Sequence, residues 1–192
     1  MSEGAKLEPG RWADGELPAN AFVGKDTLIT GDYAFKRFRS LRKPALVMGD
    51  GCTMDGVHFA LGEDGSLRVG DYCYFTNAIL LCEQEIQIGS YVVIGWNATI
   101  ADTDFHPIEP AKRIADAVAC SPLGKGRPRP EIARRPVVIE NDVWIGPNAT
   151  ILKGVRLGAG AIVEPGAMVT RNVPPGSRAL GNPAQIFVEK GR

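Results

Sequence analysis

Residues 139–173 read IENDVWIGPNATILKGVRLGAGAIVEPGAMVTRNV and repeat one pattern every six positions. An aliphatic side chain recurs at Ile139, Ile145, Ile151, Leu157, Val163 and Val169, and a small one follows four residues after each. Because six is a multiple of the strand period of two, every sixth side chain of an extended chain points to the same side. A helix would need apolar residues at intervals of three, four and seven, and the glycines here would weaken it. The repeat therefore predicts short strands joined by tight corners.

The same spacing continues towards the N-terminus. Its members are Val69, Phe75 and Leu81, then Ile88, Ile94 and Ile100, with weaker copies at Val23, Ile29, Phe35 and at Met48, Met54, Ala60. Repeats that each send one side chain to a common interior stack as a solenoid with flat faces. About eighteen repeats at three per turn predict about six coils of a triangular prism. We therefore expect an all-β fold, a parallel β-helix whose number of faces and hand the period alone leaves open.

The composition indicates one globular domain spanning 1–192. The 22 Lys and Arg residues balance the 22 Asp and Glu residues, so no overall charge attracts nucleic acid or an anionic membrane, and we expect neither as a partner. No apolar run approaches the length of a membrane span, and the opening MSEGAKLEPG is too polar for a signal peptide. These features predict a soluble, cytoplasmic protein.

Cysteine and histidine usage argues against a metal site. The four cysteines, Cys52, Cys73, Cys82 and Cys120, are too sparse and unevenly spaced for a disulfide framework or a zinc site. The two histidines, His58 and His106, cannot supply a three-histidine zinc site. We expect reduced thiols, no metal, and His58 on the surface.

Two excursions interrupt the repeat, at about 36–45 and 106–138. The first contains KRFRSLRK, with five cations and no acid. The second carries seven cations against three acids, and its six prolines deny it regular ladders, although 110–119 is a candidate helix that begins at a proline. A loop this long is usually functional, and the cations of both excursions would attract an anion, either the phosphates of a cofactor or a phosphorylated acceptor. The alternative is a solvated basic loop.

A C-terminal cap is expected over about 174–192. Asn182 and Pro183 match the N-cap and first position of a short helix that would cover the open end of the prism.

Much of the chain, roughly 69–186, resembles the hexapeptide-repeat acyltransferases, in particular the galactoside, maltose and related sugar O-acetyltransferases. The segments that carry the resemblance are YFTNAILLCEQEIQIGSYVVIGWNATI, DTDFHPI and RPVVIENDVWIGPNATILKGVRLGAGAIVEPGAMVTRNVPPGSRALGNPA. The resemblance implies a left-handed parallel β-helix, acetyl-CoA as acyl donor, and a homotrimer with active sites between neighbouring prisms.

His106 is the candidate catalytic residue. It falls where the next inward aliphatic side chain is due and the chain instead leaves the prism. The DFHPI context resembles that of the family's catalytic histidine, and an imidazole suits the removal of a proton from an attacking hydroxyl. Its second nitrogen needs an acceptor, either a backbone carbonyl or one of Asp102, Asp104 and Glu109. Because no serine or cysteine nucleophile pattern is visible, direct transfer in a ternary complex is expected.

The resemblance also suggests residues for the two substrates. Asn77 matches the acceptor-binding asparagine of sugar acetyltransferases, although asparagine is also common at tight corners. Glu83 is a second candidate for the acceptor. The positions expected to meet coenzyme A are Trp144, Pro147, Pro165, Thr170, Arg171 and Arg178, with Lys190 as a further candidate. Pro147 and Pro165 stand where relatives usually offer an N–H, which proline lacks, and Trp144 is equally suited to packing on the prism face.

Three functions remain open at this stage. The leading hypothesis is an acetyl-CoA-dependent acetyltransferase that modifies a hydroxyl of a sugar or related small molecule. An N-acetyltransferase that modifies an amine is the second, and a non-catalytic β-helix scaffold is the third. The residues named do not separate hydroxyl from amine acceptors.

Overall fold

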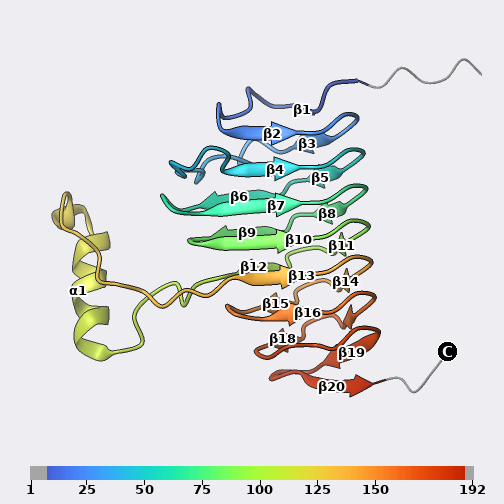
Figure 1. Ribbon diagram of the computed structural model, residues 1–192. Coiled ribbons are helices and arrows are strands. Elements are labelled where there is room, and N and C mark those ends of the chain that lie inside the picture. The colour runs from blue at the N-terminus through green and yellow to red at the C-terminus, as the bar shows by residue number, and fades with distance from the viewer. Residues whose placement is uncertain (1–7, 189–192) are drawn as a thin grey trace, which may run out of the picture.

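The structure is a computed structural model that describes residues 8–188. These residues wind into a left-handed parallel β-helix whose three flat faces are each formed by one sheet, as the sequence repeat and the family resemblance predict together (Figure 1). A long excursion that carries the helix α1 (Pro110–Cys120) projects from one side of the solenoid (Figure 1).

The three sheets, here called A, B and C, are built from short strands. Sheet A contains β1 (Arg11–Trp12), β3 (Leu28–Thr30), β5 (Thr53–Asp55), β8 (Tyr74–Thr76), β11 (Val93–Ile94), β14 (Trp144–Ile145), β17 (Ile162–Val163), β19 (Ser177–Leu180) and β20 (Gln185–Val188). Sheet B contains β2 (Ala21–Val23), β4 (Leu46–Met48), β7 (Ser66–Val69), β10 (Glu85–Ile88), β13 (Val137–Ile139) and β16 (Arg156–Leu157). Sheet C contains β6 (His58–Leu61), β9 (Ile79–Cys82), β12 (Thr99–Ala101), β15 (Thr150–Ile151) and β18 (Met168–Val169).

Each regular coil passes through the sheets in the order B, A, C, as β7, β8 and β9 do. The corners therefore stack into three edges, which we call the B–A, A–C and C–B edges. Several corners need a left-handed backbone conformation, which asparagine and glycine adopt most readily. On the A–C edge this residue is Asn77, Asn97, Asn148 or Gly166 in successive coils, with φ between +46° and +71°.

The core confirms the repeat over most of the chain. The side chains from Ile139 to Val169 at every sixth position are buried, as are the residues four positions after each. In sheet C the phase differs from the expected one, because Phe59 and Leu80 point inward in place of Ala60 and Leu81. The A–C corners before β6 and β9 are one residue shorter than the corner before β12, which moves the inward position by one.

The long excursion leaves and re-enters the prism without disturbing its ladders. Ile88 pairs with Ile139 in sheet B, and Ile100 pairs with Ile151 in sheet C, although the excursion separates these coils. Its neck is closed by an antiparallel bridge between Thr103 and Arg134. The excursion contains the predicted helix as α1 and a short 3-10 turn, η1 (Pro122–Gly124).

The first excursion is also a loop, between β3 and β4, and it packs on the prism. Phe35, expected as a member of the repeat, lies in this loop and contacts Trp12, Phe38 and Phe59 with ring centroids 5.0, 5.5 and 5.2 Å apart. The N–H of Arg39 donates to the carbonyl of Leu61 at 2.8 Å.

Two expectations about the prism ends were wrong. Eight parallel strands of sheet A give about eight coils rather than six, because β1 and β19 add coils whose sequences depart from the repeat. The C-terminal helix expected at Asn182 and Pro183 is a turn between β19 and the antiparallel strand β20, with Leu180 opposite Gln185. Asparagine and proline favour turns as strongly as helix starts, and the pairing of β20 with the edge strand β19 decides between them.

Within residues 8–188, the helices are too short and too polar for any of them to cross a bilayer.

Candidate functional site

A buried carboxylate shapes the place where the chain leaves the prism. Asp102 follows β12 on the C–B edge and is fully buried. It accepts hydrogen bonds from the backbone N–H groups of Glu83, Gln84 and Glu85 at 2.8, 2.7 and 2.7 Å. Burial raises the pKa of Asp102, while the three N–H groups oppose this change by stabilising the charged form. Asp102 thus fixes the corner of the preceding coil, next to the exit.

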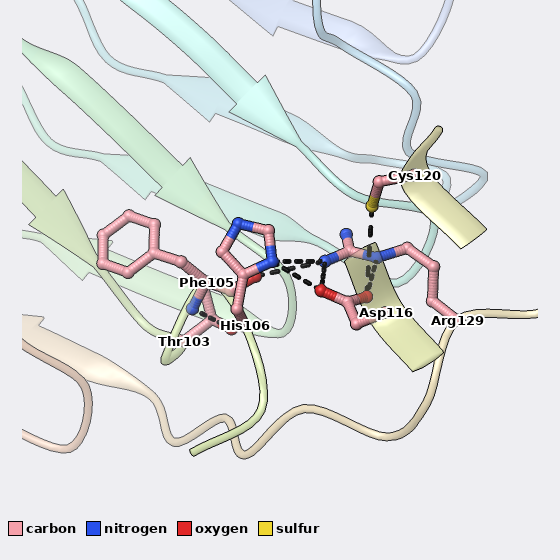
Figure 2. Close-up of polar contacts among 6 residues, drawn as sticks. All are labelled: Thr103, Phe105, His106, Asp116, Cys120 and Arg129. Atoms are coloured by element: carbon pink, nitrogen blue, oxygen red, sulfur yellow. Dashed lines mark hydrogen bonds and ion pairs between the residues drawn. The ribbon is translucent and has the colours of Figure 1, made fainter. Parts of the chain in front are cut away.

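The excursion holds the ring of His106 just outside the prism (Figure 2). Its Nδ1 lies 2.5 Å from Oδ2 of Asp116, a residue of α1. Arg129, on the segment that returns to the prism, donates from Nε to Oδ1 of Asp116 at 2.6 Å and from an Nη to Oδ2 at 3.1 Å. The same guanidinium donates to the carbonyl of Phe105 at 3.2 Å. These contacts join the departing chain, α1 and the returning segment around one imidazole.

The charge of Asp116 decides which nitrogen of His106 carries the proton. Hydrogen bonds from Arg129, and to a smaller extent from His106, lower the pKa of Asp116 to about 2 against the opposing effect of burial. Because an ionised carboxylate only accepts hydrogen bonds, Nδ1 of His106 must be the donor. In the neutral ring Nε2 then keeps its lone pair, and it points away from Asp116 and Arg129 (Figure 2). His106 is therefore arranged to take up a proton at Nε2.

The backbone that presents His106 is braced on both sides. Phe105, the preceding residue, has a left-handed φ of +65°, which is uncommon for a residue with a side chain. The carboxylate of Asp104 pairs with Lys153 of a later coil, and the N–H of Asp104 donates to the carbonyl of Ala133 at 3.0 Å. This short segment is thus held by Lys153 of a later coil and by Ala133 of the returning part of the excursion.

His106 lines a cavity of about 950 Å³ formed where the two excursions meet sheet C. The apolar side chains of Ala60 and Leu81, which point outward from sheet C, form part of its wall. The polar and charged side chains that line it are Lys36, Arg37, Arg39, Glu83, Thr103, His106, Cys120, Arg129, Glu131 and Arg134. A volume of this size is typical of a small-molecule site.

Glu83 reaches this cavity from the C–B edge, one coil before His106. A side chain on Gly62 would place its Cβ 2.0 Å from Oε2 of Glu83, so the absence of a side chain at Gly62 makes room for this carboxylate. Burial, followed by the negative charge of Asp102, raises the pKa of Glu83. The expectation that Glu83 faces the acceptor remains a prediction, and its position beside His106 is compatible with it.

The other expected acceptor residue lies elsewhere on the prism. Asn77 is a left-handed corner residue of the A–C edge, with a φ of +46°, and its side-chain oxygen lies over Gly56. It is separated from the C–B edge by the width of sheet C and does not line the cavity of His106.

The residues expected to meet coenzyme A fall into two groups. Trp144 faces outward on sheet A, between Val93 and Ile162 in the ladder, and Pro147 and Pro165 lie on the A–C edge. Thr170 and Arg171 lie on the C–B edge after β18 and line a separate hollow of about 590 Å³ beside the β19–β20 turn.

Three further residues were named in the sequence analysis. Arg178 lies on β19 and pairs with Glu164. Lys190 lies outside the described residues. His58 is exposed as predicted, and its ring stacks against Tyr33 with centroids 6.2 Å apart.

The prediction of which side chain accepts a hydrogen bond from the ring of His106 was wrong. Asp102 is occupied by three backbone N–H groups, Asp104 pairs with Lys153, and Glu109 pairs with Lys112 at 3.1 Å. The partner is Asp116, which sequence reasoning missed together with Arg129. One signal was available, because Asp116 is the only acid within the predicted helix 110–119.

Comparison with known proteins places this site in context. A family model described as bacterial transferase hexapeptide (six repeats) matches residues 136–171. A galactoside O-acetyltransferase from Lactococcus lactis is 29% identical over 148 residues, which is 76% of this chain and 64% of that protein. A 2,3,4,5-tetrahydropyridine-2,6-dicarboxylate N-acetyltransferase from Staphylococcus aureus is 59% identical over 52 residues, 27% of this chain and 22% of that protein. The chain thus spans less than two thirds of either relative.

Solved structures give a broader match. A hexapeptide-repeat-containing acetyltransferase from Vibrio cholerae is 30% identical, with a TM-score of 0.54 over 71% of this chain and 69% of that chain. The structure of its complex with acetyl-CoA is 28% identical, with a TM-score of 0.55 over 81% of this chain and 73% of that chain.

Proposed function

Because this chain belongs to the hexapeptide-repeat acetyltransferases, we propose that it transfers an acetyl group from acetyl-CoA to a hydroxyl of a sugar or related small molecule. His106 is the general base of this reaction. The observation that carries the proposal is the hydrogen bond from Nδ1 of His106 to Asp116, which leaves Nε2 free to accept a proton inside a cavity of about 950 Å³.

The proposed reaction is a direct transfer with both substrates bound. The acceptor oxygen attacks the thioester carbonyl while its proton moves to Nε2 of His106. Asp116 stabilises the imidazolium that forms, and Arg129 keeps Asp116 ionised and in place. The tetrahedral intermediate then expels the thiolate of coenzyme A, which takes up the proton from Nε2.

The residues at the C-terminal end of the prism suit the phosphates of coenzyme A in part. Arg171 and Thr170 offer a cation and a hydroxyl beside an exposed hollow. Pro147 and Pro165 have no N–H for the pantetheine amides, so any main-chain contact there comes from carbonyls or neighbouring residues.

A trimer would complete this site. Asn77, Pro147 and Pro165 lie on the A–C edge, whereas His106 and Arg171 lie on the C–B edge, so one prism does not enclose both substrates. An A–C edge from a neighbouring copy, packed against the C–B edge, would bring Asn77 towards His106. The outward ladder of Tyr74, Val93 and Trp144 on sheet A, exposed by 38–48%, supports the burial of this region in an assembly.

An amine acceptor is the second candidate. The 59% identity to an N-acetyltransferase over 52 residues favours it, and Glu83 offers a carboxylate for an ammonium group beside His106. An ester product is cleaved by mild alkali whereas an amide product survives, so treatment of the purified product separates the two reactions.

The test compares the two histidines of the chain. His106→Ala is expected to lower kcat for release of free coenzyme A by at least about 10²-fold, with little change in the KM for acetyl-CoA. His58→Ala is the matched control, since His58 is exposed and does not line the cavity, and it should keep the wild-type rate. Equal rates for both variants would refute His106 as the base. Failure of the wild type to acetylate any hydroxyl or amine acceptor would favour the scaffold.

A further inference from the structure

We infer that the acceptor is an anion, whose phosphate or carboxylate binds Lys36, Arg37 and Arg39 while its nucleophile faces His106. This inference rests on the proposed function. It assigns a ligand class to the first excursion.

The cations of the cavity divide into neutralised and unneutralised groups. Five cationic side chains line it: Lys36, Arg37, Arg39, Arg129 and Arg134. Arg129 is paired with Asp116, and Arg134 with Asp64 at 3.0 Å. Among the residues of 8–188, no ion pair joins the side chains of the other three to an acid, and Lys36 instead lies 4.3 Å from the ring centroid of Tyr33. The three positive charges therefore remain available to a ligand.

These three cations stand on a fixed turn. The turn is anchored by the rings of Phe35 and Phe38, which pack together and onto the prism. The hydroxyl of Ser40, which is only 7% exposed, donates to the carbonyl of Gly65 at 2.7 Å. The backbone bond from Arg39 to Leu61 holds the same segment against β6. Because the backbone is already ordered, binding an anion costs only the ordering of the side chains.

The position of the cations argues for the acceptor rather than coenzyme A. The thioester carbonyl must lie near Nε2 of His106 for attack, and the whole pantetheine arm separates that carbonyl from the phosphates of coenzyme A. Cations that line the same cavity as His106 therefore suit a group carried by the acceptor, whose nucleophile must lie in that cavity. Arg171 lines the other hollow. It lies on the C–B edge two coils beyond the point where the chain leaves the prism after β12, a separation of about 10 Å at the usual strand spacing.

Glu83 adds an acidic side chain to a cavity that is otherwise lined mainly by cations. The carboxylate of Glu83 and the guanidinium of Arg39 line the same cavity. An acceptor with its anion at Arg39 and a hydroxyl or ammonium at Glu83 satisfies both charges.

The experiment measures release of free coenzyme A with three matched acceptors: a neutral sugar without an amine, its phosphate monoester and its uronic acid. We expect kcat/KM at least about tenfold higher for one or both anionic members, and the better of the two identifies the anion. The triple variant Lys36→Met, Arg37→Met, Arg39→Met should raise the KM for the anionic acceptor at least about tenfold and leave the KM for acetyl-CoA unchanged. The matched control is Arg11→Met, Lys25→Met, Lys43→Met, which removes the same charge outside the cavity.

Each outcome decides the question. Higher activity with the neutral sugar would overturn the inference and keep the proposed acetyl transfer. A triple variant that loses acetyl-CoA affinity, as Arg171→Met is expected to do, would assign the cations to the cofactor and overturn the inference. Absence of turnover with every acceptor, together with no binding of acetyl-CoA in calorimetry, would overturn the proposed function itself.

Discussion

Oδ2 of Asp116 lies 2.5 Å from Nδ1 of His106, although Asp116 belongs to the helix α1 and His106 to a bend of the chain that leaves the prism after β12. The geometry around the His106 imidazole is thus set by the inserted segment and not by the solenoid. The coils fix where the chain exits, and α1 fixes how the imidazole is turned.

Asp116→Asn should impair catalysis more than binding. The substitution keeps the shape of the side chain but removes the charge that holds the Nδ1–H tautomer and stabilises the imidazolium. We expect kcat to fall at least about tenfold while the KM for acetyl-CoA stays near its wild-type value. Glu109→Gln, which neutralises an exposed acid at the start of α1, is the control and should retain full kcat. A loss confined to KM in the Asp116 variant would contradict a positioning role.

The same carboxylate should contribute to acid stability. Its pKa is lowered to about 2 in the folded state, below the value near 4 of an unfolded chain. A lowered pKa contributes stability above the unfolded pKa and loses it as the pH falls through the folded pKa. We therefore expect the Tm difference between wild type and Asp116→Asn to shrink as the pH is lowered from about 4 to about 2. A difference that stays constant across this window would show that Asp116 is not charged in the folded protein.

Gly62→Ala should act through Glu83. The three atoms nearest to the new Cβ all belong to the side chain of Glu83, so the carboxylate must move to make room for it. The expected result is a raised KM for the acceptor, similar to that of Glu83→Gln, with a small change in Tm. Combining the two substitutions should add little, because both remove the same contact. Full additivity would indicate that Gly62 has an independent role.

Mixed assemblies test whether the site is shared between chains. His106→Ala and Asn77→Ala should each be poorly active alone. If His106 and Asn77 of neighbouring chains form one site, mixing the denatured variants in equal amounts and refolding them should restore about a quarter of the wild-type rate, the share of sites with both residues intact. No recovery, with assembly confirmed by light scattering, would place both residues in one chain or remove Asn77 from the site.

The sequence predicts the prism well because the interactions that form the prism are local and repeat along the chain. A buried side chain at every sixth position determines the strands, the corners and the stacking of the coils together. The repeat that begins at Ile139 is therefore sufficient to predict the β-helix. The predictions are wrong where contacts with neighbouring coils determine the local conformation. A corner shortened by one residue turned Leu80 inward in place of Leu81, and pairing with β19 made Asn182 part of a turn.

The site was predicted less completely for a different reason. His106 is indicated by its place where the repeat breaks and, more strongly, by the DFHPI context that resembles the family's catalytic histidine. Asp116 and Arg129 lie ten and 23 residues further along the chain, in a segment without a period to indicate which way each side chain points. Their contact depends on how α1 folds back over the exit, which spacing does not encode.

The continuous ladder beneath the excursion, from Ile88 to Ile139, has a consequence for how such a protein changes. The strand ladders of the prism pair directly beneath the insert, so residues 103–135 are not part of the sheets. Substitutions there can change the orientation of His106, the proposed base, while the ladders beneath keep their pairing. The orientation of the His106 imidazole and the pairing of the sheets are thereby carried by separate parts of one short polypeptide.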